Sequence, residues 1–155
     1  MNLLLLKPDQ ILDDQAIITG RQLEHLINVQ RLEIGDSLRL GTVNGLMGQG
    51  RIRSLDAEKA CVDIHLDILP PTPLPLTLVL ALPRPKMLRR TLQTVAAMGV
   101  KTIYLINSSR VEKSFWQTPW LTPEALEEQL ILGLEQARDT LMPAVHLRKL
   151  FKPFV

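Results

Sequence analysis

Four prolines fall within residues 70–75, in the segment Leu69-Pro70-Pro71-Thr72-Pro73-Leu74-Pro75. Each proline fixes its φ angle and lacks a backbone N–H, so a run this dense does not suit the interior of a helix or a sheet. The sequence therefore predicts a stiff, extended linker over residues 70–75, with one domain in residues 1–69 and a second in residues 76–155.

The hydrophobic pattern changes across this linker. Before it, residues 61–68 alternate between apolar and polar side chains, which is typical of a strand with one face in water. After it, residues 76–82 and 102–106 are apolar stretches separated by a helical pattern, which is typical of parallel strands covered on both faces. We therefore expect an all-β first domain, a small antiparallel barrel or sandwich with one short helix, followed by an incomplete parallel α/β sheet.

Periodicity and turn residues set the expected elements. In the first domain the expected strands are 3–6, 16–19, 37–41, 48–54 and 60–69, and the helix is 22–29. Asn44-Gly45 predicts a hairpin with a long loop or a bulge, in which Gly45, Gly48 and Gly50 supply unusual dihedrals. In the second domain one helix starts at residue 84 and ends at Gly99, and another starts at residue 122 with an apolar stripe from Leu126 to Leu141. A third parallel strand is expected over residues 144–147.

Composition limits the class of protein. The chain has 155 residues, 46% of them hydrophobic and 22% charged, which is ordinary for a globular protein and unlike a disordered or membrane-spanning one. Its single cysteine, Cys61, excludes an internal disulfide and a cysteine metal cluster, and we expect no metal site and a cytoplasmic location. The apolar, uncapped segment 151–155 predicts that the chain is part of a longer protein.

Positive charge is concentrated where the first helix of the second domain begins. Residues 84–113 carry seven cations and one acid, a balance of +6, whereas the whole chain has a net charge of +2. Four of these cations, Arg84, Lys86, Arg89 and Arg90, crowd the helix N-terminus, where the macrodipole favours anions. We expect this block to bind a phosphodiester backbone; the alternative is a solvated helix face.

Several different short motifs follow one another along the two domains. In the first domain they are Ile18-Thr19-Gly20-Arg21-Gln22-Leu23-Glu24-His25-Leu26, Val29-Gln30-Arg31-Leu32 and Ile34-Gly35-Asp36. In the second they are Leu80-Ala81-Leu82-Pro83, Lys86-Met87, Gly99-Val100, Ser108-Ser109-Arg110, Glu135-Gln136 and Pro143-Ala144-Val145-His146. Together these motifs resemble the ribosomal RNA small subunit methyltransferase E family over nearly the whole chain.

The resemblance implies a PUA-like RNA-binding barrel followed by a SPOUT methyltransferase domain. Such an enzyme transfers a methyl group from S-adenosylmethionine to N3 of a uridine in 16S rRNA, free or in the assembled small ribosomal subunit, and is a homodimer at full length. In this family the cofactor is held by a glycine-rich loop and a C-terminal knot, which would lie beyond Val155. The resemblance therefore implies no cofactor-binding residue within this chain and a fragment that is inactive alone.

Candidate site residues follow from the charge pattern and the resemblance. The expected RNA-binding residues are Arg84, Lys86, Arg89, Arg90, Lys113 and Arg31. The catalytic candidates are Arg110, Glu135 and Gln136. Arg110 follows a parallel strand, where its positive charge would help a uridine N3 to lose its proton. Alternatively, Arg110 forms an ion pair with the acidic helix that starts at residue 122. We expect Glu135 and Gln136 either to hydrogen-bond the edge of a base or to bond the helix to a neighbouring loop.

Other candidates are less specific. His25 matches the barrel motif, and a histidine of this kind usually packs or caps. Trp116 and Trp120 either stack on bases or anchor their loop to the domain. The family helix reads Glu-Gln-Ser-Gly-Arg, so Arg138 stands one place early and would point about 100° away on a helix.

Two other classes of protein fit part of the pattern. A non-catalytic RNA-binding protein needs only the barrel and the basic helix. An α/β enzyme for a small phosphorylated substrate also uses a basic helix N-terminus, but it does not need a separate barrel.

Overall fold

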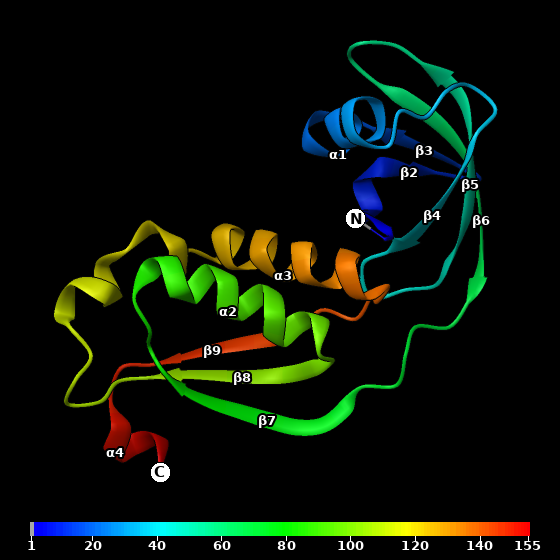
Figure 1. The fold of residues 1–155 in the computed structure, drawn as a ribbon. Coiled ribbons are helices and arrows are strands. Elements are labelled where there is room, and N and C mark those ends of the chain that lie inside the picture. Colours follow the sequence, from blue (N-terminus) through cyan, green and yellow to red (C-terminus); the bar gives the residue numbers. More distant parts are fainter. Residues whose placement is uncertain (1) are drawn as a thin grey trace. The chain divides into compact units, whose positions relative to one another are not determined.

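The computed structural model describes residues 2–155, which form two compact units that divide between Pro70 and Pro71 (Figure 1). Each unit has its own sheet. No helix in the described range is long and apolar enough to span a bilayer.

The first unit is a curled six-stranded sheet that forms an open half-barrel (Figure 1). Its strands are β1 (Leu4–Leu6), β2 (Ile11–Leu12), β3 (Gln15–Ile18), β4 (Ser37–Thr42), β5 (Met47–Leu55) and β6 (Ala60–Ile68). Their order in the sheet is β1-β4-β5-β6-β3-β2. All neighbours are antiparallel except β1 and β4, which run parallel. The alternation expected over residues 61–68 corresponds to β6.

One helical segment closes the core of this unit. Helix α1 (Gly20–Glu24) continues directly into a π-helical turn over His25–Val29, so the expected helix over residues 22–29 is present with a widened second half. It buries Leu23 and Leu26 against the strand residues Leu40 and Ile52, which are at most 1% exposed. A short 3-10 turn also lies at Pro8–Gln10.

The glycines of the β4–β5 hairpin have a role different from the expected one. The loop is longer than two residues, as predicted, but its positive φ of 59° belongs to Asn44. Gly48 and Gly50 instead leave space in β5. A Cβ at Gly48 would overlap the carbonyl oxygen of His65, and one at Gly50 would lie 2.6 Å from the Leu40 side chain. These positions need a missing side chain, because neighbouring atoms approach the β5 backbone closely.

The second unit is a parallel sheet in the order β7-β8-β9, formed by β7 (Leu74–Ala81), β8 (Val100–Ile106) and β9 (Ala144–Arg148). Helices α2 (Pro85–Ala97) and α3 (Pro123–Ala137) lie on one face (Figure 1). Two 3-10 turns, η3 (Lys113–Gln117) and η4 (Pro119–Leu121), connect β8 to α3, and a short helix α4 covers Phe151–Phe154.

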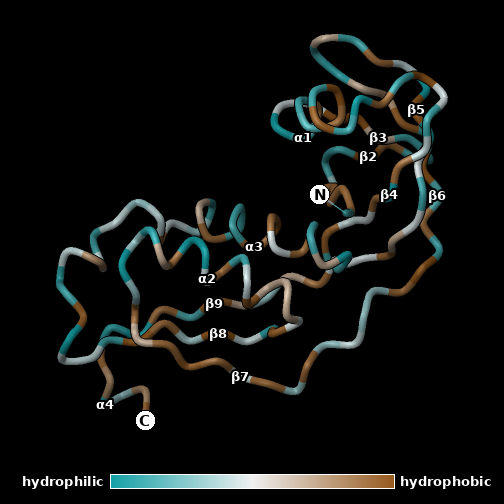
Figure 2. The backbone as a smooth tube through the Cα atoms, viewed as in Figure 1, coloured by the Kyte–Doolittle hydropathy of each residue, from teal (hydrophilic) through white to brown (hydrophobic). Residues whose placement is uncertain are grey.

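Helix and sheet pack tightly on the covered face. Ile103 and Leu105 of β8 are fully buried, as is Leu88 of α2. Helices α2 and α3 touch at Gly133, where a Cβ would lie 2.9 Å from the Cβ of Ala96. In residues 2–155 the opposite face is not covered in the same way, although coverage of both faces was expected. The mainly hydrophobic strand β7 (Figure 2) leaves Val79 46% exposed on that face.

Several element boundaries differ from the sequence prediction, and two of these differences have a clear backbone cause. Strand β7 begins at Leu74, so Pro75 lies in a strand and not in the linker. This is possible because β7 is an edge strand and its pairing with β8 is irregular between Leu74 and Thr77. Helix α3 ends at Ala137, well before Leu141, because Arg138 adopts a left-handed conformation with φ 56°. Helix α2 ends as predicted before Gly99, which has φ 87°.

Limited proteolysis is expected to cleave first beside Leu69, which is 77% exposed and lies just before the prolines. Because such linkers commonly join separately folded domains, the fragment of residues 1–69 should keep its β-sheet circular dichroism. Mass spectrometry of the early products identifies the cleavage site. Early cleavage within β5 or β6, or a fragment that unfolds on release, would contradict this expectation.

Candidate nucleic-acid interface

The carboxyl ends of β7, β8 and β9 meet at one edge of the sheet. Ala81, Ile106 and Arg148 occupy the same register position, so the segments that follow them emerge side by side. We define the carboxyl rim as residues 82–90, 107–120 and 148–149. Ligands of open parallel sheets bind outside this edge.

Helix α2 begins at the rim with a strongly positive end. Arg84 is its N-cap, Pro85 opens its first turn, and that turn contains no acid. The side chains of Arg84, Lys86, Arg89 and Arg90 are exposed, and Figure 2 shows a hydrophilic start to the helix. The first N–H groups of a helix lack intrahelical partners, so backbone donors, macrodipole and side-chain charge all favour an anion at this place.

The two tryptophans anchor the segment between β8 and α3. The guanidinium carbon of Arg89 lies 4.0 Å from the centroid of the Trp120 ring, a cation–π contact. The indole Nε1–H of Trp116 donates to Asn107 Oδ1 at 3.1 Å, and Lys149 Nζ lies 5.8 Å from the Trp116 ring centroid. Both rings therefore make contacts within the protein, which supports the anchoring interpretation over a free stacking surface.

Cations from three segments meet at the rim. Arg110 and Lys113 are exposed in the segment that follows β8, and Arg148 and Lys149 are exposed where β9 ends, with Arg148 in register with Ile106 of β8. Arg148 and Lys149 were not among the predicted site residues, although their position directly after the expected strand 144–147 was a usable signal. Among the described residues Arg110 forms no ion pair, so the alternative pairing with the acidic third helix is not observed.

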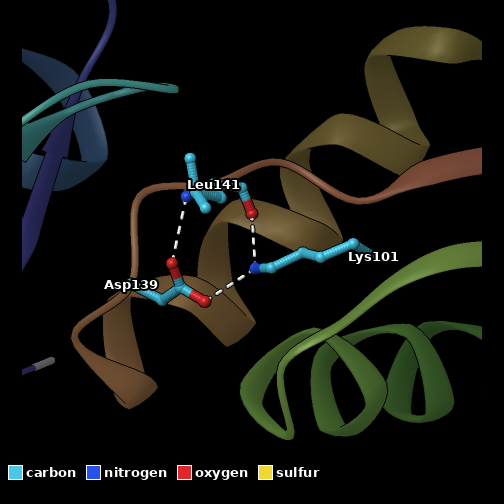
Figure 3. Close-up of polar contacts among 3 residues, drawn as sticks. All are labelled: Lys101, Asp139 and Leu141. Carbon is cyan, nitrogen blue, oxygen red and sulfur yellow. Dashed lines mark hydrogen bonds and ion pairs between the residues drawn. The ribbon is translucent and has the colours of Figure 1, made fainter. Parts of the chain in front are cut away.

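Lys101 does not contribute to this positive surface, although it was counted in the basic block. It lies near the start of β8, at the opposite edge of the sheet, and its Nζ is 2.6 Å from Asp139 Oδ2 and 2.6 Å from the Leu141 carbonyl oxygen (Figure 3). Asp139 Oδ1 also accepts a hydrogen bond from the Leu141 N–H at 3.1 Å. The pair therefore neutralises Lys101 and fixes the connection between α3 and β9.

The catalytic candidates on α3 lie away from the rim. Glu135 is 1% exposed and Gln136 is exposed, and both belong to the last turn of α3, which ends at the edge opposite the rim. Arg138 follows the helix in a left-handed conformation, so the expected displacement of about 100° around a helix is wrong. Arg110 thus follows a strand that ends at the same rim as the start of α2, whereas Glu135 and Gln136 lie away from that rim.

Arg31 and His25 belong to the first unit. Arg31 is exposed with φ 53°, just after the π-helical turn. His25 is half-buried, and its pKa lies below the usual value, chiefly because burial desolvates the ring, with the charge of Arg21 as a smaller cause. Residues 2–155 contain no group of three or more His, Cys, Asp or Glu side chains arranged to hold a metal ion.

The family model of the RNA methyltransferase domain matches residues 70–155, and the chain belongs to this family. The chain is 31% identical to the ribosomal RNA small subunit methyltransferase E of Treponema pallidum, over 99% of its own length and 59% of that protein. The resemblance seen in the sequence motifs is thus confirmed. The chain spans about three-fifths of this relative.

Solved structures confirm the fold class. A ribosomal RNA small subunit methyltransferase E from Neisseria gonorrhoeae, bound to S-adenosyl methionine, has a TM-score of 0.69 at 19% identity, covering 97% of this chain and 60% of that one. A putative methyltransferase from Legionella pneumophila, in complex with the cofactor SAM, has a TM-score of 0.71 at 17% identity, with coverages of 95% and 62%. At these identities the likeness establishes the fold alone.

Proposed function

We propose that this chain is the RNA-binding part of an S-adenosylmethionine-dependent methyltransferase that acts on N3 of a uridine in 16S rRNA, free or in the small ribosomal subunit. Membership of the RNA methyltransferase domain family and the 31% identical relative support the reaction class. The observation that carries RNA binding is the set of exposed cations around the N-terminus of α2. We further propose that the full-length protein is a cytoplasmic homodimer.

The rim residues would act on RNA in two ways. Arg84, Lys86 and Arg90 are exposed and would neutralise phosphates, which gives affinity without sequence preference. Arg110 would place positive charge beside a base, and such charge favours the form of uridine that has lost its N3 proton. Methyl transfer onto that nitrogen is the chemistry that the cofactor supplies when it is bound.

Other residues receive different roles in this proposal. Residues 1–69 would be a PUA-like barrel that holds a second part of the RNA, with Arg31 among its contacts. Lys113 would extend the phosphate-binding surface of the rim. Because Glu135 is buried and Gln136 lies off the rim, we assign both to positioning the end of α3.

The carboxyl rim is a poor fit for S-adenosylmethionine. The reactive sulfonium is a cation, whereas the rim presents cations. An open cavity of about 430 Å³ beside the rim is lined by Leu147, Arg148, Lys149, Leu150, Pro153 and Phe154 and has no carboxylate. We propose that the cofactor site requires segments of the longer relatives that have no counterpart in residues 1–155. Residues 1–155 alone would then be inactive.

Titration calorimetry of residues 1–155 with S-adenosylmethionine is expected to give no heat of binding at micromolar cofactor, because an open surface cannot bury most of the ligand. The Neisseria gonorrhoeae relative, whose structure holds the cofactor, is the matched positive control. Micromolar binding by residues 1–155 would show that the cofactor site is misplaced in this proposal.

A non-catalytic RNA-binding protein is the second candidate, because the exposed cations around the N-terminus of α2 would serve RNA binding without any methyl transfer. Methylation of 16S rRNA by a version of this protein as long as its relatives, followed by mass spectrometry of the nucleosides, distinguishes the two. Formation of 3-methyluridine supports the enzyme. Binding without any methylated nucleoside supports the second candidate.

A further inference from the structure

Asn107 is the first residue after the central strand β8, and it is held from two sides. Its backbone N–H donates to the carbonyl oxygen of Arg148, at the end of β9, at 3.3 Å. Its side-chain Oδ1 accepts the Trp116 indole N–H at 3.1 Å. Asn107 is half-buried, so both bonds hold it in a defined place at the centre of the rim.

The tryptophan also determines which end of the amide is available. An indole nitrogen can only donate, so the amide atom that faces it must be the oxygen. The amide nitrogen Nδ2 then points away from Trp116, and within residues 2–155 it has no hydrogen-bond partner. Asn107 therefore offers a pair of N–H donors, while its acceptor is already used.

Such a donor distinguishes the two pyrimidines of RNA. Uracil has a carbonyl oxygen, an acceptor, at position 4, whereas cytosine has an amino group, a donor, at the same position. Loss of the N3 proton from uracil places negative charge on that oxygen, and a hydrogen bond to a charged acceptor is the stronger kind. Lys149 Nζ lies 5.8 Å from the centroid of the Trp116 ring that bonds Asn107, so its positive charge favours the same anionic form.

We propose that Asn107 is a specificity-determining residue that selects uracil over cytosine by donating from Nδ2 to O4 of the base. This inference rests on the proposed function, because it places the target base at the carboxyl rim. A single-stranded segment suits this readout, since its bases expose their Watson–Crick edges to side chains. Phosphate oxygen is the other acceptor that the same donors suit.

The test compares binding of labelled oligouridine and oligocytidine of equal length to residues 1–155 by fluorescence anisotropy. The two ligands have the same number of phosphates, so the ratio of their affinities reports the contribution of the base alone. The unaltered protein is expected to bind oligouridine about fivefold more tightly, which corresponds to one hydrogen bond. Asn107→Leu is expected to bring the ratio to about one by lowering the affinity for oligouridine alone.

Two further variants distinguish a loss of base recognition from a loss of folding. Asn107→Asp keeps an oxygen for the Trp116 N–H but replaces the donors by an acceptor, so the preference is expected to reverse in favour of oligocytidine. Trp116→Phe removes the N–H that orients the amide, and the ratio should fall towards one. Circular dichroism confirms that each variant is folded.

Three results would overturn the inference. Equal affinities of the unaltered protein for both oligonucleotides would show that the rim does not distinguish the bases. An equal loss of affinity for both oligonucleotides in Asn107→Leu would indicate that Asn107 binds a phosphate and not the base. Absence of binding to either oligonucleotide would remove the proposed RNA-binding function together with the inference, whereas the first two results leave that function standing.

Discussion

Replacing Arg84, Lys86, Arg89 and Arg90 together by glutamine is expected to weaken RNA binding by about a hundredfold at about 0.1 M salt. The same variant should reduce the steepness of log affinity against log salt by about 2 to 3, since each neutralised phosphate of a single strand contributes about 0.7. The physical reason is that these exposed side chains surround a helix N-terminus that lacks any acid. Filter binding at several salt concentrations measures both quantities.

A pair of single variants controls for total charge. Arg90→Gln removes one exposed cation from the rim, and Arg138→Gln removes one from the opposite edge of the sheet. Only Arg90→Gln is expected to lower RNA affinity and flatten the salt dependence. An equal effect of both variants would mean that net charge, and not the rim, governs binding.

Replacing Lys101 by methionine is expected to destabilise the second unit by about 3 to 5 kcal/mol. Its ammonium group bonds both Asp139 Oδ2 and the Leu141 carbonyl oxygen, and the Lys101 and Asp139 side chains are only 15% and 6% exposed. The variant therefore leaves a buried carboxylate without its cation. Urea denaturation, followed by the fluorescence of the two tryptophans in the second unit, measures the change in free energy of unfolding.

An exposed ion pair provides the matched control. Arg53 lies 3.6 Å from Asp63, and the two side chains are 62% and 51% exposed. Arg53→Met is expected to change the free energy of unfolding by less than about 1 kcal/mol, because exposed pairs are screened by water. The double variant Lys101→Met with Asp139→Asn should be more stable than Lys101→Met, since it also removes the unpaired charge. A small effect of Lys101→Met would contradict the structural role assigned to this pair.

The fold class was predictable because side-chain periodicity reports burial directly. The alternating residues 61–68 and the apolar stretches 76–82 and 102–106 correspond to β6, β7 and β8. Boundaries set by a single backbone conformation were not predictable. The leucine stripe continues to Leu141, but Arg138 adopts the left-handed conformation without the glycine that normally signals it. Pro75 entered β7 because edge pairing tolerates a missing N–H, and no local signal identifies an edge strand.

The basic helix start was predictable because its four cations are close in sequence and share one end of one helix. A count along the chain wrongly included Lys101, because its partner Asp139 lies 38 residues away. Arg148 and Lys149 join the rim only through the pairing of β8 with β9. Asn107 gained its importance from the Trp116 indole, a contact that no spacing rule predicts.

Hydrogen exchange of residues 1–155, with and without a 16S rRNA fragment, tests most directly whether RNA binds at the carboxyl rim. Mass spectrometry of peptides locates each backbone amide that RNA protects. We expect protection over residues 84–90, 107–113 and 148–149, where α2 begins and where β8 and β9 end. RNA binding that leaves the exchange of all three segments unchanged would contradict the assignment of this surface.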